Sequence, residues 1–314
     1  MQLSDRIGRR MKLQDLHVLM AVVQAGSMGK AAERLSTTQP NVSRSIADLE
    51  HALGVRLLDR SRQGVQATQY GRALLDCGVA VFDELRQGMK NIEFLADPAT
   101  GNVRIGCNPF LTASFVSTVV DRLSRCSPRI VIDVMVADAD VLQRELRERN
   151  VDFLIARRFG PIADDRLEFK MLYDDAFVVV AGAKNRWVRR RKVKLADLVK
   201  ESWVLPRPVT ALGSVFAEAF RANGLDCPTT TVFTNHAELR TNLVMTGRFL
   251  TIFSTSVLRF STTRQQLKIL PIELPLARVP VGIVTLKNRT LSPVARLLIN
   301  CASEVARPMT KQRP

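Results

Sequence analysis

Three short amphipathic segments near the start of the chain, joined by very short connections, constrain its fold more than any other feature. In the first, Leu13–Gln24, apolar residues recur at the spacing of one helical face. Gly26 can end this helix, since glycine adopts the left-handed conformation that often follows a helix, and Ser27 can cap the next one. The second segment is Met28–Leu35, and the third begins at Gln39. The pattern predicts three helices packed around one small core.

The third helix has an apolar stripe on one face and small, polar or basic side chains on the other. Proline at its second position is compatible with a first helical turn, and Gly54 follows its end. The stripe comprises Val42, Ile46, Leu49 and Leu53. A polar helix that follows a tight turn can enter the DNA major groove, which is about 12 Å wide. The pattern therefore favours a helix-turn-helix, although a solvated helix in any three-helix domain has the same periodicity.

The next segments predict a wing and a long helix. Strands at Val55–Asp59 and Val65–Thr68 flank a basic hairpin, and helical periodicity resumes from Gln69 to Leu95. A long helix with an apolar seam and no surrounding domain usually buries that seam against a second copy. We therefore expect dimerisation through this helix, with packing inside the chain as the alternative. The expected dimerisation residues are Leu75, Phe82, Leu85 and Met89, with Gly78 and Ile92 in the same two rows.

Beyond Gly101 the chain alternates between strands and helices. Strands are expected at Val103–Cys107, Ile130–Val136, Val151–Ala156, Ala176–Ala181, Trp203–Leu205, Thr230–Thr234, Leu250–Phe253 and Val281–Thr285. Helices are expected at Thr112–Ser124, Ala139–Arg149, Ser214–Asn223, Ala237–Met245 and Ser292–Ala306. This alternation implies βαβ units and a parallel sheet, and the length is sufficient for two small lobes. The predicted fold class is α/β with an all-α, winged N-terminal domain.

The identities of the residues in the N-terminal region indicate a protein family more specifically than the spacing of its apolar residues does. Three stretches carry a resemblance: Gly-Ser-Met-Gly-Lys-Ala-Ala-Glu-Arg-Leu, Thr-Thr-Gln-Pro-Asn-Val-Ser-Arg-Ser-Ile-Ala-Asp-Leu-Glu and Leu-Gly-Val-Arg-Leu-Leu-Asp-Arg. Together, between Leu13 and Leu75, they closely resemble the LysR-type transcriptional regulators. The resemblance implies a winged helix-turn-helix, a linker helix and a two-lobed Rossmann-like domain resembling periplasmic binding proteins. The expected domains are residues 11–68 (DNA binding), 69–96 (linker and dimerisation helix), 101–172 with 276–306 (lobe I of the effector domain) and 173–275 (lobe II).

The resemblance also implies DNA contacts at specific positions. The recognition-helix contacts would be Thr38, Gln39, Pro40, Ser43 and Arg44, and the wing contact Arg62. Glutamine can pair with adenine, and arginine with guanine or phosphate. The sequence Thr-Gln-Tyr-Gly at residues 68–71 departs from the usual Thr-Glu-Ala-Gly of the family. The resemblance further implies a homotetramer built as a dimer of dimers on a partly palindromic operator, with RNA polymerase as a partner.

In two-lobed α/β domains a ligand binds in the crevice beyond the carboxyl ends of the strands. Residues that follow the predicted strands are therefore candidates for effector binding. They are Asn108, Thr112, Arg157, Arg207, Asn235, His236 and Ser254. If several arginines line the crevice, the effector is anionic, such as a carboxylate or sugar acid. There are alternatives to each of these interpretations. The effector could be a neutral sugar, the arginines could form surface salt bridges, and His236 could cap the helix that follows it.

The net charge of +16 favours a polyanionic partner without locating its surface. Residues 96–314 carry +13 of it and residues 1–95 only +3. Five scattered cysteines, with no metal-ligand spacing, suit a reducing cytoplasm. No apolar run is long enough to span a membrane, and we expect no membrane partner.

Two other classes of protein compete with the regulator. An α/β enzyme would need a catalytic motif, but the sequence has no GxSxG elbow, phosphate-binding loop, GxGxxG after a strand, or HExxH. We therefore expect no catalytic residues, no metal site and no cofactor. A nucleoid-type protein that binds DNA without sequence preference would not need the long α/β region. A promoter footprint that changes with ligand would distinguish the three classes.

Overall fold

The computed structural model describes residues 11–61, 64–161, 164–228, 230–260, 264–274 and 278–310. The chain forms two compact units, Met1–Arg86 and Gln87–Pro314, here called the N-terminal and C-terminal units. Helix α5 (Gln69–Ala96) begins in the first and ends in the second.

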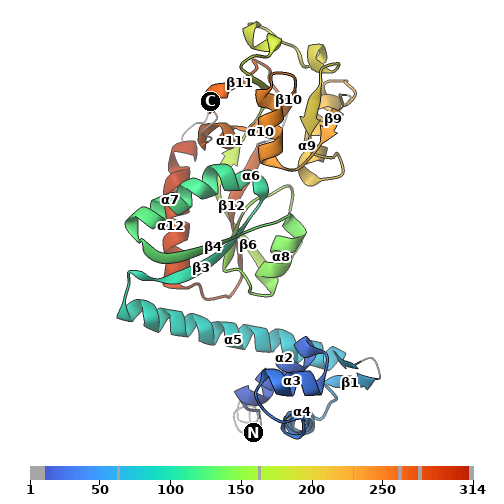
Figure 1. Ribbon diagram of the computed structural model, residues 1–314, viewed down its shortest axis with the longest axis vertical. Helices are drawn as coiled ribbons and strands as arrows, with labels where there is room; N and C mark the ends of the chain where they lie inside the picture. The colour runs from blue at the N-terminus through green and yellow to red at the C-terminus, as the bar shows by residue number, and fades with distance from the viewer. Residues whose placement is uncertain are drawn as a thin grey trace. The chain divides into compact units, whose positions relative to one another are not determined.

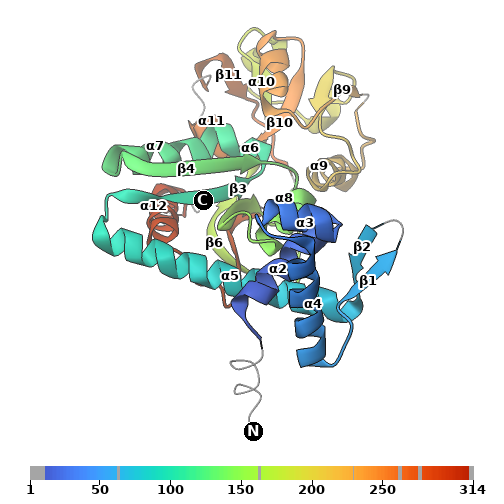
Figure 2. The same cartoon turned by 60° about the horizontal axis from the view of Figure 1, so that its bottom comes forward.

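The N-terminal unit has a small helical core with a hairpin beside it (Figures 1 and 2). Its elements are α2 (Leu13–Ala25), α3 (Met28–Arg34), α4 (Gln39–Leu53), β1 (Leu58–Ser61) and β2 (Gly64–Ala67). The predicted stripes form most of the core, where Leu19 and Ile46 are fully buried. Leu53 was predicted to face inward but is 43% exposed, because it lies at the very end of α4, beyond the buried positions Val42, Ile46 and Leu49. Gly26 and Gly54 end their helices as predicted, with φ of 66° and 72°, in the left-handed conformation that often follows a helix.

The hairpin differs from the predicted wing in where its strands lie. The first strand begins at Leu58 instead of Val55, and the second begins at Gly64. Ser61 pairs with Gly64, so the ladder continues into residues expected to be turn. The N–H of Val65 bonds the carbonyl of Gly26 at 2.9 Å, which anchors the second strand to the helical core. This contact between residues distant in sequence has no local signature.

Helix α5 begins in close contact with the wing. The Thr68 hydroxyl accepts a hydrogen bond from the N–H of Gly71 at 3.0 Å, as an N-cap does. It also donates to the carbonyl of Arg56 at 2.8 Å. A Cβ at position 71 would lie 2.1 Å from the carbonyl oxygen of Leu57, so only glycine fits there. The Thr-Gln-Tyr-Gly segment at residues 68–71 departs from the usual motif of the family. It nevertheless keeps Thr68 and Gly71, the two residues on which the contact between α5 and the wing depends.

The C-terminal unit contains two mixed five-stranded sheets, one in each lobe. The lobe I sheet has the order β4-β3-β5-β12-β6, formed by β3 (Thr100–Cys107), β4 (Arg129–Val136), β5 (Phe153–Arg157), β6 (Leu167–Asp175) and β12 (Val279–Leu286). Helices α7 (Ser117–Cys126) and α12 (Pro293–Thr310) cover one face, and α8 (Ala139–Arg147) covers the other (Figure 1). A short helix, α6 (Pro109–Leu111), and a π-helical turn, η1 (Thr112–Val116), precede α7.

The lobe II sheet has the order β11-β7-β10-β8-β9. Its strands are β7 (Phe177–Gly182), β8 (Trp203–Leu205), β9 (Thr230–Phe233), β10 (Leu250–Ser254) and β11 (Leu267–Ile269). Its helices are α9 (Ala211–Ala222), α10 (Ala237–Met245) and α11 (Thr255–Phe260), with short turns η2 (Arg186–Arg189), η3 (Leu195–Leu198) and η4 (Arg264–Gln266). The chain passes from lobe I to lobe II at Ala176 and returns before Val279.

The prediction of parallel sheets was only partly correct. Strands β3, β4 and β5 are parallel, but β12 is antiparallel to β5 and β6, and β10 is antiparallel to β7. Strand β12 runs the other way because the chain re-enters lobe I from lobe II instead of through a helix of the same lobe. Strands β6 and β11 and helix α11 were not predicted. Within the described residues, no helix has the length and apolarity needed to cross a membrane.

Candidate DNA-binding surface and effector site

The first turns of α4 form an exposed polar surface. Thr38, Gln39, Pro40 and Arg44 are exposed, and Ser43 is half-buried. The opposite face of the helix is buried, so these side chains lie together on the outside. The first N–H groups of a helix lack intrahelical partners and can donate to a phosphate. This surface therefore offers hydroxyl, amide and guanidinium groups beside free backbone donors.

Glu50 holds α4 against the wing, a role that was not predicted from the sequence. One of its carboxylate oxygens accepts hydrogen bonds from the N–H groups of Leu57 at 2.7 Å and Leu58 at 3.2 Å. Bonds of this charged type are roughly twice as strong as neutral ones. A glutamate in the last turn of a helix interacts unfavourably with the helix dipole. This placement is the feature of the sequence that could have indicated a structural role for Glu50.

The predicted wing contact, Arg62, lies outside the described residues. The strands on either side of it are described, and Arg60 on β1 is exposed. A role for Arg62 in DNA contact therefore stays a prediction.

The predicted dimerisation residues on α5 fall into two groups. Leu75 packs against the core of the N-terminal unit, and Phe82 lies beside His17 with ring centroids 5.6 Å apart. Leu85 and Met89 are instead 48% and 63% exposed. The exposed apolar residues of α5 at this end lie three or four positions apart: Leu85, Met89, Ile92 and Leu95. We call these four residues the α5 row.

A cavity of about 370 Å³ lies between the two lobes of the C-terminal unit. This volume is within the range of small-molecule sites, about 300–1,000 Å³. Lobe I contributes Asn108, Pro109, Phe110, Asp138, Ala139, Asp140, Arg157 and Phe159, and lobe II contributes Val209, Thr210, Ala211, Leu212 and Asn235. The lining is thus apolar in part, with polar and charged groups from both lobes. We call it the interlobe cavity.

Three of the predicted effector residues line this cavity: Asn108, Arg157 and Asn235. Ser254 is buried in a smaller adjoining space of about 10 Å³. Thr112 lines neither space, and its hydroxyl donates to the carbonyl of Asn108 at 3.2 Å.

Two other predicted residues lie outside these spaces. Arg207 and His236 are exposed, and neither lines the interlobe cavity or the smaller space. His236 occupies the N-cap position of α10, but its side chain makes no capping hydrogen bond. The capping role considered for His236 was therefore wrong.

Arg157 and Asp175 form a buried ion pair where the lobes meet. Their side chains are 4% and 0% exposed, and an Arg157 Nη lies 2.9 Å from an Asp175 oxygen. The same Nη donates to the Ser254 hydroxyl at 2.6 Å. Asp175 also accepts hydrogen bonds from the N–H of Ser256 at 3.1 Å and from the hydroxyl of Thr255 at 3.2 Å. The network joins the ends of β5 and β6 in lobe I to the start of α11 in lobe II.

Arg240 on α10 is fully buried beside this network. Its Nη2 donates to the Thr251 hydroxyl at 2.7 Å and to the carbonyl of Ile252 at 2.6 Å. Its guanidinium carbon lies 5.1 Å and 4.9 Å from the ring centroids of Phe110 and Phe253. Burial, with the nearby charge of Arg157, lowers the pKa of Arg240 to about 9. The side chain therefore remains cationic at neutral pH despite its burial.

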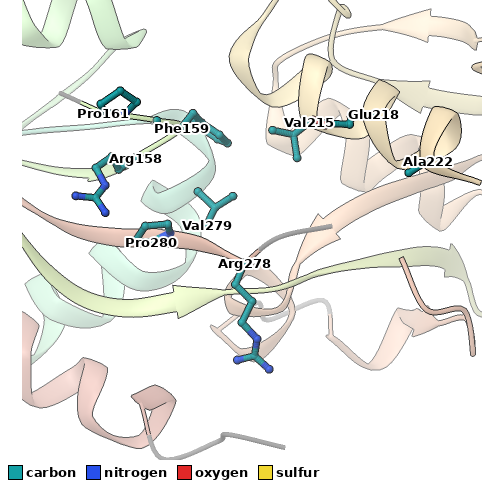
Figure 3. A pocket seen from close by; sticks show the side chains of 10 residues that line it. Arg158, Phe159, Pro161, Val215, Glu218, Ala222, Arg278, Val279 and Pro280 are labelled. Carbon is teal, nitrogen blue, oxygen red and sulfur yellow. The ribbon is translucent and has the colours of Figure 1, made fainter. Parts of the chain in front are cut away.

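A second cavity, of about 800 Å³, lies on the other side of Phe159 (Figure 3). Arg158, Phe159 and Pro161 lie across from Val215, Glu218 and Ala222 of α9. The guanidinium groups of Arg158 and Arg278 point away from the space between these two groups of residues. Arg158 instead stacks on Phe169 at 4.7 Å. The cavity is therefore mainly apolar, with few groups to orient a ligand.

The described residues contain no cluster of histidine, cysteine and carboxylate side chains that could hold a metal ion. All five cysteines are free, and burial raises the pKa of the Cys107 thiol. The geometry therefore offers two binding surfaces, an exposed helix end in one unit and an interlobe cavity in the other.

Comparisons with known proteins agree with this arrangement. Residues 13–72 match the model for bacterial regulatory helix-turn-helix proteins of the LysR family, and residues 96–307 match that for the LysR substrate binding domain. The transcriptional regulator GbpR of Azospirillum brasilense is 27% identical over 288 residues, which cover 91% of this chain and 84% of GbpR. The regulator TdcA of Escherichia coli (strain K12) is 27% identical over 293 residues, 93% of each chain.

Solved structures show the same fold. A full-length OxyR from Pseudomonas aeruginosa is similar with a TM-score of 0.65 and 21% identity, covering 97% of this chain and 99% of OxyR. Full-length CbnR in complex with its target DNA has a TM-score of 0.55 and 20% identity, covering 94% and 100%. LysR-family proteins are regulators and not enzymes, so the enzyme alternative is set aside. The chain belongs to the LysR family of transcriptional regulators, with a DNA-binding helix-turn-helix and an effector-binding domain.

Proposed function

We propose that this regulator reads base edges with the first turns of α4 and responds to a small molecule in the interlobe cavity. The observation that carries the proposal is the exposure of Gln39 and Arg44 on a helix whose other face forms the core. Glutamine and arginine at such a surface can pair with adenine and guanine in the major groove. The structure of CbnR with its target DNA supports this use of the fold.

We propose that Asn108, Arg157 and Asn235 contact the effector directly, because they line the interlobe cavity from both lobes. A ligand that touches both lobes stabilises one relative arrangement of them, which is how binding can alter activity elsewhere in the protein. We propose RNA polymerase as the partner that receives this change, and the cytoplasm as the compartment, since operator and polymerase are found there.

The α5 row supports a dimer. Its four apolar side chains are exposed, and such a row on a long helix is usually covered by a partner helix. We propose that a second copy of the chain covers it, and that two such dimers form a tetramer. Recognition helices in one dimer would then meet successive major grooves about 34–36 Å apart.

Replacing Met89 with glutamate should weaken the dimer, because association would bury two charged carboxylates. We expect the dissociation constant to rise at least about a hundredfold, or about 3 kcal/mol. Sedimentation velocity over a range of concentrations measures this change. Ala73→Glu places the same charge on an exposed part of α5 outside the row and should leave assembly unchanged. An M89E protein that assembles like the wild type would contradict the proposed interface.

Footprinting of the full chain on DNA fragments selected from genomic DNA tests the whole function. We expect protection of a partial palindrome, with half-sites about one helical turn apart, and a pattern that changes when an effector is added. Equal protection along unrelated DNA would instead indicate a nucleoid-type protein. A sequence-specific footprint that no cavity ligand alters would contradict the effector part of the proposal.

A further inference from the structure

Arg240 carries a buried positive charge that has no carboxylate partner among the described residues. Its Nη1 is buried and makes no hydrogen bond, whereas Nε and Nη2 are bonded to Thr251 and Ile252. A buried cation left without a counter-charge is costly, and proteins usually pair or neutralise it. The two phenyl rings around Arg240 stabilise it only in part, since cation–π contacts contribute about 0.5–2 kcal/mol.

The other arginines at this site are less suited to bind an anion. Arg157 already pairs with Asp175 and bonds Ser254, so its charge is balanced. Arg207 is exposed and lines neither space. The unbalanced charge at the interlobe site is therefore that of Arg240.

Arg240 lies directly behind a wall of the interlobe cavity. It lines the small space of about 10 Å³, and Phe110, Arg157 and Leu212 line both that space and the larger cavity. These three side chains thus separate the two spaces, and Phe110 lies against the guanidinium. Displacement of the Phe110 ring would join the small space that Arg240 lines to the larger cavity. Phe110 is half-buried, and its helix α6 is only three residues long.

Two carboxylates also line the interlobe cavity. Asp138 and Asp140, at the start of α8, line it and are exposed. They would repel a second anionic group and accept hydrogen bonds from hydroxyl or ammonium groups.

We propose that Arg240 is the anion-binding residue of the effector site, which takes a small monocarboxylate carrying hydroxyl or amino groups, with Phe110 as the gate in front of it. The carboxylate bonds Nη1, and the donor groups face Asp138 and Asp140. Dicarboxylates and neutral amides of the same size are excluded. The inference rests on the proposed function, because it concerns the ligand of the same cavity.

Thermal-shift and calorimetric titration of the full chain test the proposal. The probes are hydroxy- and amino-monocarboxylates from glycolate to mandelate, each compared with its primary amide and with a matching dicarboxylate. We expect binding by monocarboxylates alone, and a dissociation constant about a hundredfold higher in Arg240→Met. Arg240→Lys keeps the charge without the planar fork and should retain the preference for anions at lower affinity. Arg207→Met, a matched exposed control, should bind like the wild type.

Phe110→Ala removes the gate and should speed carboxylate association while leaving selectivity for anions.

Amides that bind as well as their acids would overturn the proposal, and so would equal affinity in Arg240→Met or a panel without a single monocarboxylate binder. Two further results distinguish a failure of this inference from a failure of the proposed function. A carboxylate that needs Arg240 but leaves the footprint unchanged contradicts the effector role alone. An effector that changes the footprint and binds Arg240→Met normally overturns only the role of Arg240.

Discussion

Replacing Asp175 with alanine should lower the free energy of unfolding of the C-terminal unit by about 3–5 kcal/mol, the range for breaking a buried ion pair. The substitution leaves Arg157, only 4% exposed, without its counter-charge. It also removes the acceptor for Ser256 and Thr255 at the start of α11. Two buried cations, Arg157 and Arg240, would then lie close together with no balancing carboxylate among the described residues.

Urea unfolding followed by tryptophan fluorescence measures this loss. The chain has two tryptophans, Trp187 and Trp203, and both lie in lobe II, so the signal reports the C-terminal unit. Asp121→Ala is the control, because its ion pair with Arg125 is 57% and 77% exposed. Exposed pairs contribute about 0–1 kcal/mol, so this variant should unfold almost like the wild type. Equal stability of D175A and D121A would contradict the structural role of the buried pair.

The double substitution Ser43→Ala with Arg44→Ala should weaken operator binding by about 2–6 kcal/mol, since each lost contact contributes about 1–3 kcal/mol. Neither side chain belongs to the core, and Arg44 forms no ion pair with a described residue. Stability should therefore change little, as for most surface substitutions, which stay within about 0.5 kcal/mol.

Fluorescence anisotropy at fixed salt, on operator and on scrambled DNA, measures the affinity and the specificity ratio. Thermal unfolding checks that the variant is folded. Arg125→Ala removes one exposed positive charge from the C-terminal unit and should bind the operator normally. If the double variant kept full affinity and specificity, the surface around the start of α4 could not be the one that reads DNA.

The helical part of the fold could be predicted because its signals are local. Gly26 and Gly54 end their helices as predicted, and three of the four residues of the predicted α4 stripe are buried, Leu53 being the exception. The direction of a strand in its sheet cannot be predicted in the same way, because it depends on the path of the chain before that strand. The return of β12 from lobe II makes it antiparallel to β5, and nothing within Val279–Leu286 records that path.

The effector site was only partly predictable for a related reason. Asn108 and Asn235 come just after strands and Arg157 is the last residue of β5, so the general rule about strand ends found them. Arg240 lies within a helix and resembles an ordinary surface residue in the sequence Ala-Glu-Leu-Arg. Its burial depends on Phe110 and Phe253, which come from distant parts of the chain. Pairings of this kind become visible only in three dimensions.

The close contact at Gly71 determines where domains of different regulators with this architecture can be fused. The backbone of Leu57 touches the first turn of α5, and a Cβ at Gly78 would lie 3.1–3.2 Å from side-chain atoms of Leu16 and Met20. A DNA-reading module transplanted into another scaffold should therefore carry its own stretch of α5 through residue 82, where Phe82 meets His17. If the graft were joined at the wing instead, about the first four turns of the foreign helix would face a surface to which their side chains are not complementary.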